Sequence, residues 1–155
     1  MQLDKNAKAG LKAYSLQYDN LKRKEEIIEH DFRESRKVVR YLSRSKDDFL
    51  WANATMKIIE SAKLKQELGL PADFQNLYHW LIIESYYAMY HAATAAIAKR
   101  KIKAETHIAT ITSLAKHYVT TDELELDPVK VLENVYLTYI ESGRESIDGS
   151  QYNVD

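Results

Sequence analysis

The 155-residue sequence contains no cysteine, only 2 prolines and only 4 glycines. Without cysteine the chain can form no disulfide framework, no thiolate nucleophile and no zinc or iron–sulfur site with Cys ligands. So few glycines and prolines cannot supply the many turns of a β-sandwich or barrel. The glycines are also widely separated, which excludes the glycine-rich phosphate loops of Rossmann-type and P-loop nucleotide folds. We therefore expect an all-α protein.

Long apolar runs are also missing. The N-terminal residues MQLDKNAKAG have no apolar core of the signal-peptide type. The longest apolar window, about residues 78–98, contains His79, Glu84, Ser85 and His91, whose burial in lipid would be costly. We expect no membrane span, no membrane partner and a cytoplasmic location. Apolar residues make up 45% of the chain and charged residues 29%, which is typical of a globular domain.

The net charge of −1 conceals an uneven distribution of charge. Residues 1–120 carry 20 Lys and Arg against 14 Asp and Glu, whereas the last 35 residues carry 2 against 9. A basic body is therefore followed by an acidic tail.

Apolar spacing predicts the helices. A seam with steps of three and four, typical of a helix that packs along one stripe, consists of Leu11, Tyr14, Tyr18, Leu21, Ile28, Phe32, Val39 and Leu42, with Glu25 and Ser35 as the two polar members of the series. Ser45 and Asp48 have the spacing of a capping box that would open a second helix, which should stop at Gly69 and Pro71. Further helices are expected over about 72–101 and 106–118, and from Asp127–Pro128 onward. We predict one domain over residues 1–155, with a helical arm (1–30) and an up-and-down bundle of four to five helices (31–153).

The helix expected at 72–101 contains the sequence SYYAMYHAATAAI, residues 85–97, which is followed by ETHIATI, residues 105–111. Together with the C-terminal SGRESIDGSQYNVD, these segments resemble the HEPN superfamily, especially its small stand-alone prokaryotic members. The resemblance covers about residues 31–153. It implies a helical bundle that forms a homodimer and binds RNA or a nucleotide. It also implies metal-independent endoribonuclease activity in toxin members, and a small nucleotidyltransferase as the antitoxin partner.

Active members of that superfamily carry an Arg followed, after four to six residues, by a His. The segment RKIKAETH offers Arg100 and His107, and RKEEIIEH offers Arg23 and His30 outside the resemblance. In the catalytic interpretation His107 exchanges a proton with the ribose 2′-hydroxyl or the leaving oxygen, and Arg100 binds the phosphate. In the alternative interpretation His107 caps or packs its helix and Arg100 is a solvated residue of a basic cluster.

The tyrosine-rich helix supplies a second set of candidates. Glu84, Tyr87 and His91 can share one helix face, where they could hold a nucleobase or form a buried packing network. Our candidate nucleotide site consists of Tyr86, Tyr87, His91 and Arg144. Arg144 could assist in phosphate binding. No His pair has the i, i+4 spacing that binds a metal on a helix, so we expect no metal and no cofactor.

A ridge of basic side chains is the clearest electrostatic feature. Its members recur every three or four residues in RESRKVVRYLSR and are Arg33, Arg36, Lys37, Arg40 and Arg44. Guanidinium groups bind phosphates through paired hydrogen bonds, so the ridge is a candidate site for RNA or a polyphosphate, with Arg36 and Arg40 at its centre. Nearby acids or the acidic tail could instead neutralise it. The sequence thus favours an RNA- or nucleotide-directed protein, with a non-catalytic dimeric interaction module as the alternative.

Overall fold

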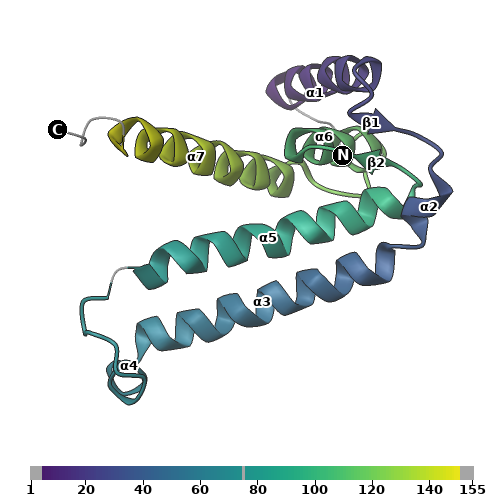
Figure 1. The fold of residues 1–155 in the computed structure, drawn as a ribbon. Coiled ribbons are helices and arrows are strands. Elements are labelled where there is room, and N and C mark those ends of the chain that lie inside the picture. The colour runs from purple at the N-terminus through teal and green to yellow at the C-terminus, as the bar shows by residue number, and fades with distance from the viewer. Residues whose placement is uncertain (1–4, 75, 151–155) are drawn as a thin grey trace. The chain divides into compact units, whose positions relative to one another are not determined.

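A computed structural model describes residues 5–74 and 76–150, and the side chains of 9–74, 76–138 and 140 (Figure 1). Its first elements are α1 (Lys5–Arg23), β1 (Ile27–Ile28), α2 (Phe32–Ser35), α3 (Val38–Glu60) and α4 (Ala62–Glu67). They are followed by α5 (Asn76–Lys99), β2 (Lys103–Ala104), α6 (His107–Leu114), the π-helical turn η1 (Ala115–Val119) and α7 (Leu126–Ser150). The structure is 76% helical and 3% strand, which confirms the all-α prediction. None of the helices within these ranges is long and apolar enough to span a bilayer.

The chain forms two compact units. One, the hairpin unit, comprises Glu29–Lys103 and contains α2 to α5. The other, the terminal unit, comprises the described residues up to Ile28 and from Ala104, and contains α1, α6, η1 and α7. The short strands β1 and β2 pair in a two-stranded sheet.

The hairpin unit is built on α3 and α5, which run antiparallel and side by side (Figure 1). Small side chains let the two helices approach closely, among them the buried Ala52, Ala88 and Ala95. Polar contacts fix their register: Ser45 Oγ donates to the Ala88 carbonyl oxygen at 2.8 Å, and Thr55 Oγ1 donates to Glu84 at 2.9 Å.

The terminal unit packs α1 against α6, η1 and α7 in a single core. The apolar stripe of α1 is buried and consists of Leu11, Tyr14, Tyr18 and Leu21. Tyr14 donates a hydrogen bond from its hydroxyl to Glu133 of α7, and the Tyr18 hydroxyl lies 2.9 Å from His117 Nε2 in η1. The N-terminal half of the predicted seam is therefore a core stripe.

The rest of the seam is not a continuation of that helix, contrary to our prediction. α1 ends at Arg23, and Glu25 (φ 60°) and His30 (φ 62°) both adopt left-handed backbone conformations that a helix cannot contain. The predicted seam residues Val39 and Leu42, beyond this break, are exposed on α3. The apolar period of the sequence thus continues across three separate helices, α1, α2 and α3.

The predicted capping box at Ser45 and Asp48 is also wrong. α3 runs without interruption through both residues, whose side chains contact α5 instead. The real break is at Ser61, whose side chain caps α4 by accepting from the Leu64 N–H at 3.2 Å. The predicted stop near Gly69 is present, because α4 ends at Glu67 and Gly69 takes a φ of 67°.

Candidate phosphate-binding site

Three arginines of the ridge lie at the start of α3 and in the turn just before it. Arg40 and Arg44 are one turn apart on the same side of α3. Arg36 ends α2 and lies in the turn between α2 and α3. All three are exposed, and none makes an ion pair or hydrogen bond with another described side chain.

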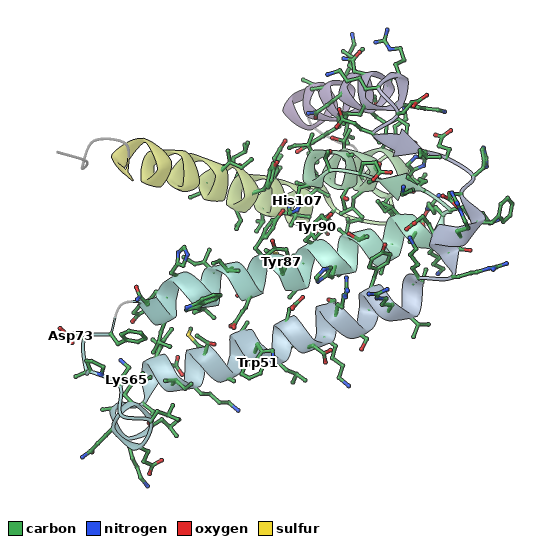
Figure 2. The ribbon with its side chains drawn as sticks, viewed as in Figure 1. Trp51, Lys65, Asp73, Tyr87, Tyr90 and His107 are labelled. Atoms are coloured by element: carbon green, nitrogen blue, oxygen red, sulfur yellow. The ribbon has the colours of Figure 1, made fainter. Side chains whose placement is uncertain are left out.

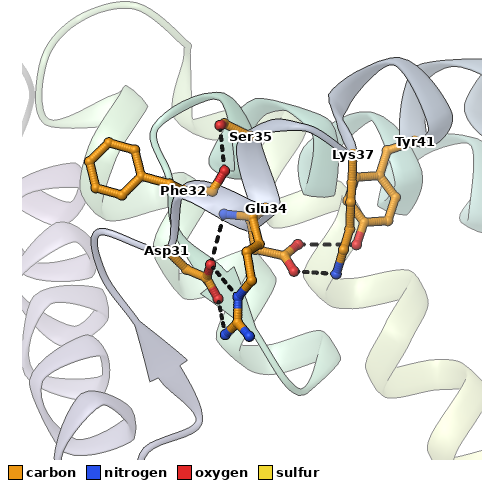
Figure 3. Close-up of polar contacts among 7 residues, drawn as sticks. Asp31, Phe32, Glu34, Ser35, Lys37 and Tyr41 are labelled. Carbon is orange, nitrogen blue, oxygen red and sulfur yellow. Dashed lines mark hydrogen bonds and ion pairs between the residues drawn. The ribbon is translucent and has the colours of Figure 1, made fainter.

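The other two cations of the ridge are neutralised within the hairpin unit (Figure 3). Arg33 donates to both carboxylate oxygens of Asp31, with Nε 3.2 Å from Oδ1 and Nη2 3.1 Å from Oδ2. Lys37 donates to the buried carboxylate of Glu34, which also accepts from the Tyr41 hydroxyl at 3.2 Å. The local acids thus bind Arg33 and Lys37 and leave Arg36, Arg40 and Arg44 available.

These contacts also shape the junction between α2 and α3. Asp31 caps α2 by accepting from the Arg33 backbone N–H at 2.9 Å, and the hydrogen bonds from Arg33 lower the pKa of the Asp31 carboxyl. The hydrogen bond to Glu34 raises the pKa of the Lys37 ammonium, and burial raises the pKa of the Tyr41 hydroxyl. The contacts of Glu34 with Lys37 and Tyr41 therefore tie α2 to the start of α3, on either side of the turn that contains Arg36.

An open hollow of about 450 Å³ follows the arginines on α3 and is lined by Asp47, Leu50, Trp51 and Ala54. Arg44, Asp47 and Trp51 follow one another at steps of three and four, so the hollow continues the arginine face. Trp51, labelled on α3 in Figure 2, is 65% exposed. Trp51 was not among the site residues predicted from the sequence, although it follows Arg44 by seven residues, which is two helical turns.

The tyrosine-rich face of α5 has a different environment. Tyr86 is buried, with 3% of its surface exposed, and it stacks on Tyr90 with ring centroids 6.0 Å apart. His91 Nδ1 lies 2.6 Å from Asp48 of α3, and its ring is 5.8 Å from that of Tyr87. Glu84 accepts a hydrogen bond from Thr55 of α3. Glu84 and His91 thus each contact α3, in the manner of a packing network.

Arg100 and His107 belong to different units. Arg100, partly buried, follows α5 in the hairpin unit, where its backbone N–H donates to the Ile97 carbonyl oxygen at 3.0 Å. His107 is the first residue of α6 in the terminal unit, and its ring centroid lies 5.2 Å from that of Tyr136. Thr106, not His107, caps this helix. The side chain of Arg144 lies outside the described residues, as do the side chains of the acidic tail from residue 141 onward.

Within the ranges that the structure describes, no group of three or more His, Asp and Glu side chains could hold a metal ion. The candidate site is therefore built from guanidinium groups and one exposed indole.

No protein-family model matches the chain, and no curated protein and no solved structure matches it either.

Proposed function

We propose that the protein binds RNA through the phosphates of its backbone, with Arg36, Arg40 and Arg44 as the contacting side chains. One observation carries this proposal: Arg40 and Arg44 are exposed one turn apart on α3, Arg36 is exposed in the turn just before it, and all three are unpaired among the described side chains. An arginine already bound to a carboxylate would have to give up that partner before it could bind phosphate. These three have no such competitor among the side chains that the structure describes.

The spacing favours a polymer over a mononucleotide. Positions four residues apart are separated by about 6 Å along a helix axis, so the guanidinium groups of Arg40 and Arg44 suit successive phosphates of an extended strand. Arg36, just before α3, could contact a further phosphate of the same strand. Each guanidinium can bind a phosphate through two parallel hydrogen bonds, and each contact releases counterions. The hairpin unit as a whole carries 13 Lys and Arg against 9 Asp and Glu, which also favours a polyanionic ligand.

The HEPN resemblance supports an extension of this proposal to RNA cleavage. The ribose 2′-oxygen would attack the adjacent phosphorus and the 5′-oxygen would leave with a proton, giving a cyclic phosphate and a free 5′-hydroxyl. His107 would act as acid and base and Arg100 would bind the phosphate, with Arg144 or Tyr86 assisting. A toxin role, with a nucleotidyltransferase-type antitoxin as partner, belongs to the same extension.

The binding proposal is tested with fluorescently labelled single-stranded RNA and the triple variant R36Q/R40Q/R44Q. We expect the triple variant to bind at least about tenfold more weakly, because one charge-assisted hydrogen bond contributes about 1.5 kcal/mol or more. The matched control is K12Q/K57Q/K99Q, which removes three exposed charges elsewhere and should retain most of the affinity. Equal affinity of the triple variant and the control would refute the proposal.

A second candidate function is a dimeric interaction module, favoured by exposed apolar side chains on α3. They lie at helical spacing beside the arginine face and are Val39, Leu42, Phe49 and Met56, each more than two-fifths exposed. Apolar stripes of this kind mark protein–protein contacts. Light scattering of wild type and of L42E/F49E tests this module as a homodimer: we expect a dimer that the two charges dissociate, and a monomeric wild type would refute it.

A further inference from the structure

We infer that the hollow at Trp51 is a stacking site for one unpaired RNA base, next to the phosphate-binding arginines. This inference rests on the proposed RNA binding and adds the kind of RNA, a single strand, and the kind of base. The hollow and the arginines share one face of α3, so a strand bound to Arg40 and Arg44 would reach Trp51 within about two helical turns.

The environment of Trp51 suits stacking. Its indole is 65% exposed and has no ring partner among the described side chains. The chain has one other tryptophan, Trp80 on α5, and that ring packs edge-on against His79 at 6.5 Å between centroids. Leu50 and Ala54 give the hollow apolar walls beside the indole. A flat, partly apolar base fits such a surface, and base stacking on exposed aromatic rings is common in proteins that bind single strands.

Asp47 indicates which part of the nucleotide enters the hollow. Its exposed carboxylate lines the hollow and forms no ion pair with another described side chain. A carboxylate repels phosphate but accepts a hydrogen bond from the exocyclic amino group of a base, as in Asp and Glu contacts to cytosine. The three arginines therefore bind phosphates, while Asp47 and Trp51 bind a base that carries an amino group.

A paired strand could not use this site. In an A-form duplex the bases are stacked on one another and hydrogen-bonded to their partners, so their faces are closed to an indole. Single-stranded RNA exposes both the base face and its amino group. The hollow should therefore distinguish single strands from duplexes, and cytosine from uracil, which has no amino group.

The test compares oligo(C), oligo(U) and a duplex RNA of equal length as ligands of the full chain. Trp51→Ala should bind oligo(C) about tenfold more weakly and the duplex as tightly as wild type does. Asp47→Ala, which removes the acceptor, should reduce the preference for oligo(C) over oligo(U), and an unchanged preference would overturn the role of Asp47. Trp80→Ala is the matched control and should bind all three RNAs as wild type does.

A second measurement does not depend on the Ala variant. In Trp80→Phe, Trp51 is the sole tryptophan, and its fluorescence should be quenched by oligo(C) and not by the duplex. Unchanged oligo(C) affinity in Trp51→Ala, or unquenched Trp51 fluorescence at saturating oligo(C), would overturn the inference. If R36Q/R40Q/R44Q is still impaired in that case, the proposed RNA binding stands and only the base site is wrong. If the triple variant binds like wild type, the RNA-binding proposal itself fails.

Discussion

His91 Nδ1 lies 2.6 Å from an Asp48 carboxylate oxygen, which joins the tyrosine-rich helix α5 to α3. Both side chains are partly buried, with 17% and 28% of their surfaces exposed. A carboxylate can only accept, so Nδ1 carries the proton in this contact. The histidine of the sequence segment that resembles HEPN proteins therefore holds the helical hairpin together.

Removing either partner of this contact should destabilise the protein. We expect Asp48→Ala to lower the free energy of unfolding by about 1 to 3 kcal/mol, because a partly buried histidine loses a charge-assisted hydrogen bond. Urea denaturation of Asp48→Ala, His91→Ala and the double variant measures the coupling between them. Strictly additive losses would contradict a direct interaction.

Tyr14 is expected to stabilise the terminal unit through its hydroxyl, which donates to Glu133. Tyr14→Phe should lower the free energy of unfolding by about 1 to 2 kcal/mol, since the side chain is buried and Glu133 loses a donor. Tyr78→Phe, at an exposed position, is the control and should change stability by less than about 0.5 kcal/mol. A loss in Tyr14→Phe no larger than in the control would contradict this role.

The hydroxyl of Tyr14 should also make the stability of the protein depend on pH in the alkaline range. Burial, the hydrogen bond to Glu133 and the charge of Glu133 raise the pKa of Tyr14 above its ordinary value of 10.0. The folded state therefore holds this proton more tightly than the unfolded state, and the resulting stability is complete below pH 10 and lost as the pH rises above it. Unfolding curves recorded across this range should show a steeper loss for wild type than for Tyr14→Phe.

Asp31 should make the stability of the protein depend on pH in the acidic range, with stability lost as the pH falls. Its hydrogen bonds with Arg33 lower the pKa of the carboxyl below its ordinary value of 3.8, so its contribution to stability is present above pH 3.8 and lost as the pH falls. Asp31→Asn keeps an oxygen that can cap α2 but removes the charge. The variant should therefore lose less stability than wild type between neutral pH and pH 3, and identical acid profiles would contradict the assignment.

Cleavage by the Arg–His pair remains a prediction of the HEPN resemblance. We expect wild type to cut single-stranded RNA without a metal, and His107→Ala to cut about 100-fold more slowly or worse, because it lacks the acid and base. His79→Ala, at an exposed position on α5, is the control. Product analysis should find a cyclic phosphate. Unchanged cleavage in His107→Ala would reject this assignment.

The sequence predicted the helices better than their ends. The apolar period of Leu11 and Tyr18 located a buried stripe, because a 3.6-residue period reflects burial directly. It could not reveal the left-handed backbone at Glu25, since glutamate rarely adopts that conformation and carries no local signal for it. Ser45 resembled a helix cap because its sequence spacing fits one, but its hydroxyl bonds to α5, a contact between distant parts of the sequence.

The candidate site was predicted in part. Arg36 and Arg40 were identified from their spacing, but which cations of the ridge would be neutralised depends on contacts that spacing alone does not give. Arg33 binds Asp31 because Asp31 caps the start of α2, and Lys37 binds Glu34 because the turn between α2 and α3 brings these two together. Trp51 was not among the residues predicted from the sequence, and its exposure, which distinguishes it from a core residue, is visible only in the structure.

The salt dependence of RNA binding tests the central claim most directly, because each phosphate contact releases counterions. For a single strand, the slope of log K against log salt concentration changes by about 0.7 per contact, so R36Q/R40Q/R44Q should reduce it by about 2. K12Q/K57Q/K99Q should leave the slope close to that of wild type. A slope equal to that of wild type in R36Q/R40Q/R44Q would contradict phosphate binding by this face of α3.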